Sequence, residues 1–296
     1  MHTLKKAWQK NAVAYLFLTP WLIGLLGLTA IPMGASLYFS FTSYDMFTSP
    51  TWVGLGNYTE MFEDDKWISS VKVTLTYVFL SVPLQLMFAL GVAAALNRGL
   101  KGLRFYRAIY YVPSLFGGSV AVALLWRQLF GGEGLVNRAL AQFGIEGTNW
   151  ISQPDTALYT LIILAVWQFG APMVIFLAGL KQIPTELYEA SMIDGAGKAK
   201  QFFKITIPLL TPIVLFNVIM QVISAFQAFT PAYIVSGGTG GPLDSTLFYT
   251  LYLYQKAFTQ FQMGYASAMA WLLLLTIAVI TALIFLSARK WVHYQE

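Results

Sequence analysis

Six long apolar stretches, separated by polar connections, run along the chain. They cover about residues 12–39, 70–96, 106–129, 156–180, 209–235 and 265–288. Each is long enough to cross a bilayer, because a membrane-spanning helix needs roughly 20 apolar residues. Only helices and closed β-barrels satisfy all backbone hydrogen bonds in lipid. None of the stretches shows the alternation of apolar and polar residues that barrel strands require, so all six are predicted to be helices. The pattern predicts an all-α, polytopic membrane protein with six transmembrane helices, several of them kinked by internal prolines.

Basic residues gather in alternate connections. One side of the predicted membrane holds Lys5, Lys6, Lys10, Arg98, Lys101, Arg104, Arg107, Lys181, Lys198, Lys200, Lys204, Arg289 and Lys290. The connections on the other side collect most of the acidic residues. Cytoplasmic loops of membrane proteins are enriched in Lys and Arg, so both termini are predicted to lie in the cytoplasm.

The composition describes a chain surrounded by lipid, with 57% hydrophobic and 10% charged residues. The basic residues behind the formal net charge of +5 are distributed by loop, mostly on one side of the predicted membrane, and do not form a patch for nucleic acid. Membrane lipid is therefore an expected partner and nucleic acid is not. The first stretch is too long for the core of a signal peptide and is expected to stay in the protein. No linker and no internal repeat divides the chain, so residues 1–296 are predicted to form one domain.

Residue types that commonly carry catalysis are scarce in the chain. The chain has no cysteine, and its two histidines, His2 and His293, lie near the ends. This excludes thiolate chemistry and a histidine base or metal site in the membrane, so no catalytic residue, metal or cofactor is expected. None of the six stretches has an interior Asp or Glu. This absence argues against an ion-coupled secondary transporter and against a membrane-embedded enzyme.

The fourth connection, residues 181–208, differs from the others because it mixes polar and apolar residues. Pro184 followed by Glu186 predicts the start of a helix. Gly195 and Gly197 predict a sharp turn, after which residues 199–205 are expected to form a second short helix. The resulting hairpin could dock into a soluble partner, or it could lie on the membrane surface without one.

The residues EASMIDGAGKAKQFFKITIP, from Glu189 to Pro208, resemble a family signature. Permeases of binding-protein-dependent ABC importers carry Glu-Ala-Ala, three residues, glycine, nine residues and Ile-x-Leu-Pro. Here Ser191 and Ile207 replace the third and the penultimate defined positions. The carbohydrate branch of that family, in the six-span form of its maltose-type first permease, is also similar at residues 16–45, 54–58, 109–130 and 240–242.

The resemblance implies a bacterial cytoplasmic (inner) membrane location and a set of partners. These are a second homologous permease, two ATPase subunits on the cytoplasmic side and an extracytoplasmic solute-binding protein. The partner ATPase would bind ATP and Mg²⁺, since this chain lacks a G-x-x-x-x-G-K-[ST] pattern. The hairpin would be the coupling loop that docks on the ATPase, through Glu189, Ala190, Ser191, Asp194 and the turn at Gly195.

Polar side chains in the fifth and fourth stretches are candidates for contact with a sugar, the expected substrate. Gln221, Ser224 and Gln227 share one helical face. Asn217 and Tyr233 lie on the same stretch, and Gln168 lies on the fourth. Amides and hydroxyls suit a sugar, but hydrogen bonds between helices would need the same residues. The resemblance favours Ser224 and Gln227.

A di- or oligosaccharide is the expected cargo, and glycerol-phosphate or a related polyol is the rival. Arg127 is the arginine placed to meet an anion from outside. An arginine at that depth is also a common interfacial anchor.

Overall fold

The computed structural model describes residues 15–97 and 102–293, and over these residues the protein is predominantly α-helical. The all-α prediction therefore holds apart from a single pair of two-residue strands in the described chain. Several basic residues used for the topology prediction lie outside the described residues, as do His2 and the start of the first stretch. These basic residues are Lys5, Lys6, Lys10, Arg98 and Lys101.

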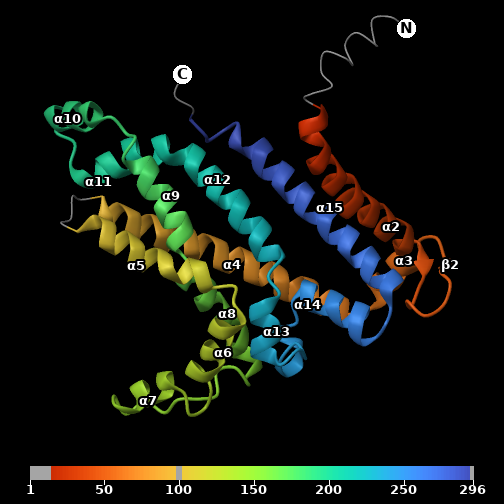
Figure 1. Cartoon of the computed structure of the whole chain (residues 1–296). Coiled ribbons are helices and arrows are strands. Elements are labelled where there is room, and N and C mark those ends of the chain that lie inside the picture. The colour runs from red at the N-terminus through yellow and green to blue at the C-terminus, as the bar shows by residue number, and fades with distance from the viewer. Residues whose placement is uncertain (1–14, 98–101, 294–296) are drawn as a thin grey trace, which may run out of the picture. The chain divides into compact units, whose positions relative to one another are not determined.

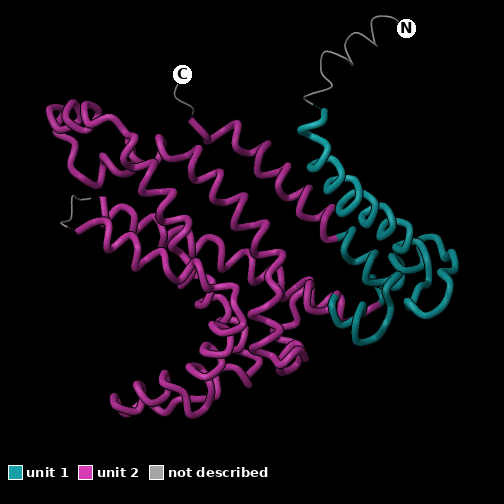
Figure 2. The backbone as a smooth tube through the Cα atoms, in the orientation of Figure 1, with its two compact units in different colours: residues 1–63, 254–272 teal, residues 64–253, 273–296 magenta. Residues whose placement is uncertain are grey.

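The chain folds as two compact units (Figure 2). Unit 1 comprises residues 1–63 and 254–272, and unit 2 comprises residues 64–253 and 273–296. One helix, α15 (Met263–Ala288), begins in unit 1 and ends in unit 2.

Unit 1 contains a long apolar helix, Tyr15–Ser40, followed by two short strands and a short helix within residues 42–63. Asn57 ties this segment to the end of the long helix, because its buried side chain donates through Nδ2 to the carbonyl oxygens of Ser40 and Thr42, both at 2.9 Å. The elements of unit 1 are η1 (Gly24–Ala30), α2 (Ile31–Ser40), β1 (Thr42–Ser43), antiparallel β2 (Thr51–Trp52), α3 (Gly56–Glu63) and η4 (Gln255–Thr259).

Unit 2 is organised around α4 (Asp65–Leu96), which packs against α8, α9 and α12 (Figure 1). The side chain of Asp64 caps α4 by accepting from the backbone N–H groups of Lys66 and Trp67. The other elements of unit 2 are α5 (Leu103–Phe116), α6 (Val120–Leu129), α7 (Leu135–Ala141), α8 (Pro154–Trp167), α9 (Gly170–Leu180), α10 (Thr185–Ile193), α11 (Lys198–Gln201), η2 (Phe202–Thr206), α12 (Ile207–Phe226), α13 (Thr230–Ser236), η3 (Pro242–Asp244) and α14 (Tyr249–Tyr254), which runs to the unit boundary.

Four helices of the described chain are long and apolar enough to cross a membrane by themselves. They are Tyr15–Ser40, Asp65–Leu96, Lys198–Ser236 and Met263–Ala288. Two further spans arise if the pair α5 and α6 and the pair α8 and α9 each count as one. The structure thus provides four to six candidate spans.

The third and fourth predicted stretches are each broken into two helices, in line with the expectation of kinked spans. The axes of α5 and α6 differ by 97°, and those of α8 and α9 by 40°. The first break follows Gly117 and Gly118, and the Oγ of Ser119 starts α6 by accepting from the N–H of Val122 at 3.3 Å. Glycine and a capping serine, rather than Pro113, therefore mark this break.

Close packing between α5 and α9 depends on Gly170, the first residue of α9. A Cβ atom at this position would overlap the carbonyl oxygen of Tyr110 and press on the Oγ of Ser114. By contrast, a Cβ on Gly91 in α4 would meet no atom within 4 Å.

We predict that Gly170→Ala destabilises unit 2, whereas Gly91→Ala does not. Forcing a methyl group against a backbone carbonyl costs about 1–3 kcal/mol in a well-packed site. Gly91→Ala serves as the matched control, because Ala is favoured over Gly by up to about 1 kcal/mol within a helix. Thermal unfolding of the detergent-solubilised protein, followed by tryptophan fluorescence, checks both. Equal melting temperatures for the two variants would contradict the packing argument.

Candidate functional site

A cavity of about 270 Å³ lies inside unit 2, where the broken helices meet α4. Its walls come from α4, α8, α12, the start of α13 and the two irregular segments that follow α5 and α12, near the point where α8, α12 and α13 approach one another in Figure 1. The lining residues are Tyr77, Ser81, Gln85, Gly117, Gly118, Ala165, Gln168, Gln221, Ser224, Ala225, Gln227, Ala228, Phe229, Thr230 and Pro231.

Four of the six residues predicted to contact substrate line this cavity. They are Gln168, Gln221, Ser224 and Gln227. Asn217 does not line it, since its side chain is buried and its Nδ2 donates to the carbonyl oxygen of Ile213 at 3.1 Å. Tyr233 is not a lining residue either, but it lies next to the cavity wall in α13, with its ring centroid 5.3 Å from that of the lining residue Phe229.

Sequence reasoning missed the polar face that α4 contributes. Tyr77, Ser81 and Gln85 follow one another at intervals of four residues, so they share a face of the helix and line the cavity. The same helical periodicity had identified Gln221 and Ser224 on the fifth stretch. The glycine pair Gly117 and Gly118, inside an apolar stretch, was a second available signal.

The breaks are tied together by hydrogen bonds around Gln168, the residue that ends α8. Its carbonyl oxygen accepts from the Nε2 of Gln85 at 3.2 Å and from the Oγ of Ser114 at 2.9 Å. Its side-chain Nε2 donates to the carbonyl oxygen of Gly117 at 3.1 Å. The Oγ of Ser114 also accepts from the N–H of Ala171, at 2.9 Å. Irregular backbone at membrane depth is tolerated where it is satisfied in this way and lines a cavity.

The cavity contains no charged side chain among its lining residues. Its polar atoms are amides, hydroxyls and backbone groups, and Tyr77 and Phe229 add aromatic surface. Such a lining suits a neutral ligand that carries many hydroxyl groups.

The predicted hairpin in residues 181–208 is present. Its first helix, α10, follows Pro184, and Gly195 ends it with a φ of +73°, a left-handed conformation that favours glycine. The second helix differs from the expectation of a separate element over 199–205. Helical structure starts at Lys198 and continues through η2 into α12, so this arm is the beginning of the fifth stretch.

Side-chain hydrogen bonds close the hairpin on its inner face. The Nε2 of Gln201 donates to the Oγ of Ser191 at 2.8 Å and to the carbonyl oxygen of Tyr188 at 3.2 Å. The hydroxyl groups of Tyr188 and Thr206 lie 2.8 Å apart and share a hydrogen bond. Ser191 therefore holds the two arms together.

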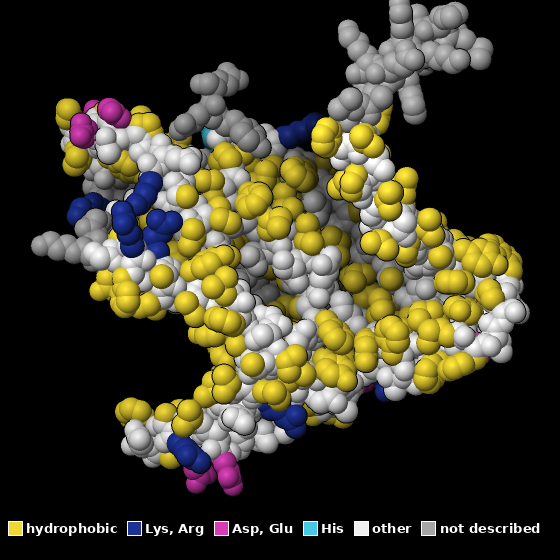
Figure 3. Space-filling model, in the orientation of Figure 1, with side chains coloured by type: hydrophobic (Ala, Val, Ile, Leu, Met, Phe, Trp, Pro, Cys, Tyr) yellow, Lys and Arg dark blue, Asp and Glu magenta, His cyan; other side chains and the backbone are white. Residues whose placement is uncertain are grey.

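The outer face of α10 is open. Glu189 and Ala190 are exposed, as is Asp194 directly after the helix, and α10 has no buried residue. Met192 and Ile193 are also exposed, and Ile193 retains 89% of its accessible surface. Figure 3 shows acidic and hydrophobic side chains side by side over α10. Exposed apolar residues on a polar loop are typical of a protein interaction site.

The family profile described as "Binding-protein-dependent transport system inner membrane component" matches residues 53–293. That range includes the cavity and the hairpin. The chain belongs to this family of membrane transport components, which assigns it a role in transport rather than in enzymatic catalysis.

Two relatives and one solved structure are similar over nearly the whole chain. The "Probable ABC transporter permease protein YesP" of Bacillus subtilis (strain 168) is 56% identical over 290 residues, which cover 97% of this chain and 94% of the relative. The sn-glycerol-3-phosphate transport system permease protein UgpA of Yersinia pestis bv. Antiqua (strain Antiqua) is 32% identical over 285 residues, covering 93% and 96%. A chain of a bacterial alginate ABC transporter, crystallised with an alginate pentasaccharide-bound periplasmic protein, has the same fold, with a TM-score of 0.82, 20% identity and 96% coverage of both chains.

We predict that Gly195→Ala loosens the hairpin, whereas Gly197→Ala leaves it intact. A residue with a Cβ in the left-handed conformation costs about 1 kcal/mol, which corresponds to roughly fivefold faster local opening. Gly197 is the matched control, because its φ is −71° and a Cβ there meets nothing within 4 Å. Hydrogen–deuterium exchange of residues 185–201 measures the opening. Equal exchange in both variants would show that the turn does not depend on Gly195.

Proposed function

We propose that this chain is the permease subunit of an ATP-driven importer and that it passes a sugar through the cavity of unit 2. The observation that carries the proposal is the uncharged, amide- and hydroxyl-lined cavity at three helix breaks. A di- or oligosaccharide suits this lining, because each hydroxyl can replace its water hydrogen bonds with protein ones. Alternating access would expose the cavity to each side of the membrane in turn.

The proposed topology has six spans with both termini in the bacterial cytoplasm. It counts each bent pair, α5 with α6 and α8 with α9, as one span. Basic side chains gather at one end of unit 2, over α11 and the start of α5, close to the hairpin (Figure 3). This clustering supports a cytoplasmic position for that end. In this proposal the two units work together as one transmembrane domain within residues 1–296.

Coupling to ATP would occur through α10. The chain has no phosphate-binding loop, so ATP and Mg²⁺ would bind to two partner ATPase subunits. The exposed face with Glu189, Ala190 and Ile193 would seat in the ATPase, and the bonds around Ser191 and Gln201 would keep the hairpin rigid. Since the second arm continues into α12, movement of the hairpin would reach the cavity residues Gln221 and Ser224 without an intervening loop.

Two further partners complete the proposed assembly. A second homologous permease would cover the helix Tyr15–Ser40, whose most apolar window has no buried residue. An extracytoplasmic solute-binding protein would deliver the sugar, consistent with the family of the chain.

An anionic cargo such as glycerol-phosphate is the rival, and it is suggested by the similarity to UgpA. A phosphate would need cationic partners, and the cavity has none among its lining residues. The arginine considered for this role, Arg127, is exposed and lines a separate pocket of about 380 Å³ with Asn149 and Ser152. The neutral sugar therefore fits the cavity better.

We predict that Glu189→Arg abolishes stimulation of the partner ATPase while the chain still inserts in the membrane. Reversing an exposed charge within a docking contact costs several kcal/mol in binding. Glu146→Arg, a charge reversal at another exposed loop, is the matched control and is expected to keep full stimulation. ATPase activity of the reconstituted transporter with liganded binding protein is the measurement. Full stimulation of the Glu189→Arg variant would refute the docking role of α10.

We also predict that the pair of changes Gln221→Ala and Gln227→Ala lowers sugar uptake about tenfold. Losing two net hydrogen bonds to a sugar removes about 1–3 kcal/mol of binding. Gln128→Ala, at an exposed position of α6 that does not line the cavity, is expected to leave uptake unchanged. Uptake by proteoliposomes is measured with the ligand found by screening the cognate solute-binding protein. A phosphorylated ligand in that screen would replace the neutral sugar with the rival.

A further inference from the structure

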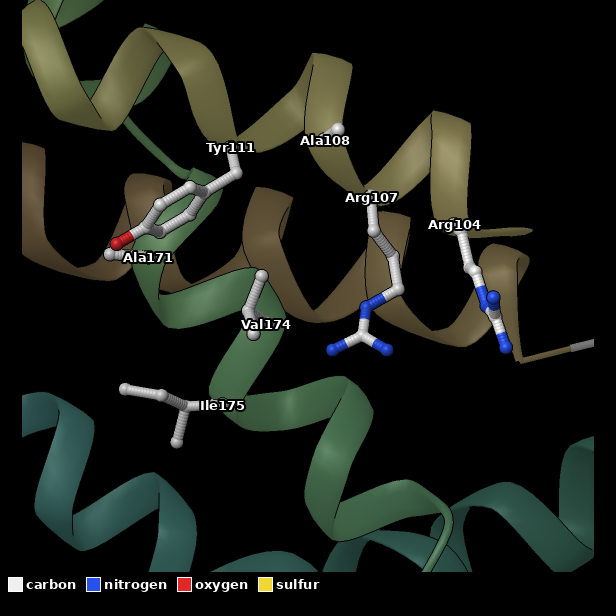
Figure 4. A pocket seen from close by; sticks show the side chains of 7 residues that line it. All are labelled: Arg104, Arg107, Ala108, Tyr111, Ala171, Val174 and Ile175. Atoms are coloured by element: carbon white, nitrogen blue, oxygen red, sulfur yellow. The ribbon is translucent and has the colours of Figure 1, made fainter. Parts of the chain in front are cut away.

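A groove of about 500 Å³ lies between α5 and α9, separate from the cavity described above. Figure 4 shows its seven lining residues. Arg104 and Arg107 extend from α5 toward α9, and Tyr111 follows further along α5. The remaining walls are the small or aliphatic side chains of Ala108, Ala171, Val174 and Ile175.

The two arginines lack acidic partners within the part of the chain that the structure describes. Neither guanidinium group forms a hydrogen bond or an ion pair with a residue in 15–97 or 102–293. No Asp or Glu lines the groove, although Arg107 is half-buried there. Two cations that converge on one groove without an anion favour a ligand that brings negative charge.

The charged groups of the groove lie at one end, and its remaining walls are mainly aliphatic and aromatic. The positions of Arg104 and Tyr111 are about 10 Å apart along α5, at 1.5 Å per residue. Beyond the guanidinium groups, the Tyr111 hydroxyl is the remaining polar side-chain group of the lining. The sugar cavity, in contrast, is lined by four glutamines and two serines. An amphipathic molecule with an anionic head and an aliphatic tail fits the groove, and a sugar does not.

The surroundings of the groove are those of a lipid-facing surface. No residue of α5 is buried, and Phe105 and Ile109 expose 68% and 48% of their surface. Basic pockets between transmembrane helices on the cytoplasmic side are known to hold anionic lipid headgroups. This step rests on the cytoplasmic placement of the start of α5 under the proposed function.

We propose that the groove binds one anionic phospholipid of the cytoplasmic leaflet. Arg104 and Arg107 hold its phosphate, and an acyl chain lies along Ala108, Val174 and Ile175. Because α9 leads directly into the segment before α10, a lipid bound at its flank stabilises the helix that positions the coupling hairpin.

The test uses the complete transporter, purified in mild detergent and mixed with equal amounts of phosphatidylglycerol and phosphatidylcholine. Native mass spectrometry then counts the retained lipids. The wild-type complex is expected to retain phosphatidylglycerol preferentially. The double change Arg104→Gln and Arg107→Gln is expected to reduce this preference about thirtyfold, since each basic residue contributes about 1 kcal/mol to binding of anionic lipid. Arg104→Lys with Arg107→Lys is expected to keep most of it.

Lys198→Gln with Lys200→Gln is the matched control. It removes the same charge from exposed positions of α11 that do not line the groove, so the lipid preference is expected to persist. Equal loss in both double variants, or displacement of the lipid by inorganic phosphate alone, would overturn the proposal. Loss of the second permease from the Arg104→Gln, Arg107→Gln complex would instead assign the groove to a subunit contact. Lipid retention does not depend on sugar uptake, so failure of the proposed function would be seen separately, as absent uptake with the lipid preference unchanged.

Discussion

The constraint on which the rest of the structure depends is that backbone polar groups in lipid must find partners within the protein. The helices of three apolar stretches are interrupted, and at each break a backbone carbonyl group accepts a hydrogen bond from a side chain. The carbonyl oxygen of Gln168 is bonded by Gln85 and Ser114, that of Gly117 by the side chain of Gln168, and that of Ala228 by the Oγ of Thr250 at 2.5 Å. The same interruptions leave side-chain amides and hydroxyls around a small space. The same arrangement of polar side chains therefore satisfies the backbone at the breaks and gives the cavity its polar lining.

This arrangement also connects the hairpin to the cavity. The arm that begins at Lys198 is continuous with α12, and α12 places Gln221 and Ser224 at the cavity wall. On the other side of the hairpin, α9 begins just after the break at Gln168. It packs tightly on α5 through Gly170. Under the proposed function, a displacement of the hairpin would reach the cavity wall on α12 without an intervening loop, whereas on the side of α9 it would pass through the turn at residues 181–184 and the break at Gln168. The groove between α5 and α9 lies beside one of these arms.

Much of the fold followed from periodicity and composition. The apolar stretches predicted the long helices, because twenty apolar residues have few other ways to satisfy their backbone in a bilayer. Pro184 and Gly195 predicted the limits of α10, since proline favours a helix start and glycine tolerates the left-handed turn. The helical spacing of Gln221, Ser224 and Gln227 identified one wall of the cavity. Helical spacing of polar residues also occurs at Tyr77, Ser81 and Gln85, so the wall on α4 was equally predictable from the sequence.

The sequence by itself determined which segments are apolar, which loop is a polar hairpin and which polar residues are spaced to share a helical face, because these properties depend on neighbours in the chain. Only the tertiary structure decided that Gln168, Gln85 and Gly117 meet at one point, that Asn217 bonds to its own helix, and that Ser191 bonds to Gln201 across the hairpin. It also decided that Arg104 and Arg107 face one groove with α9. The physical reason is that the direction of a polar side chain depends on which helix packs beside it, and residues far apart in the chain supply that helix.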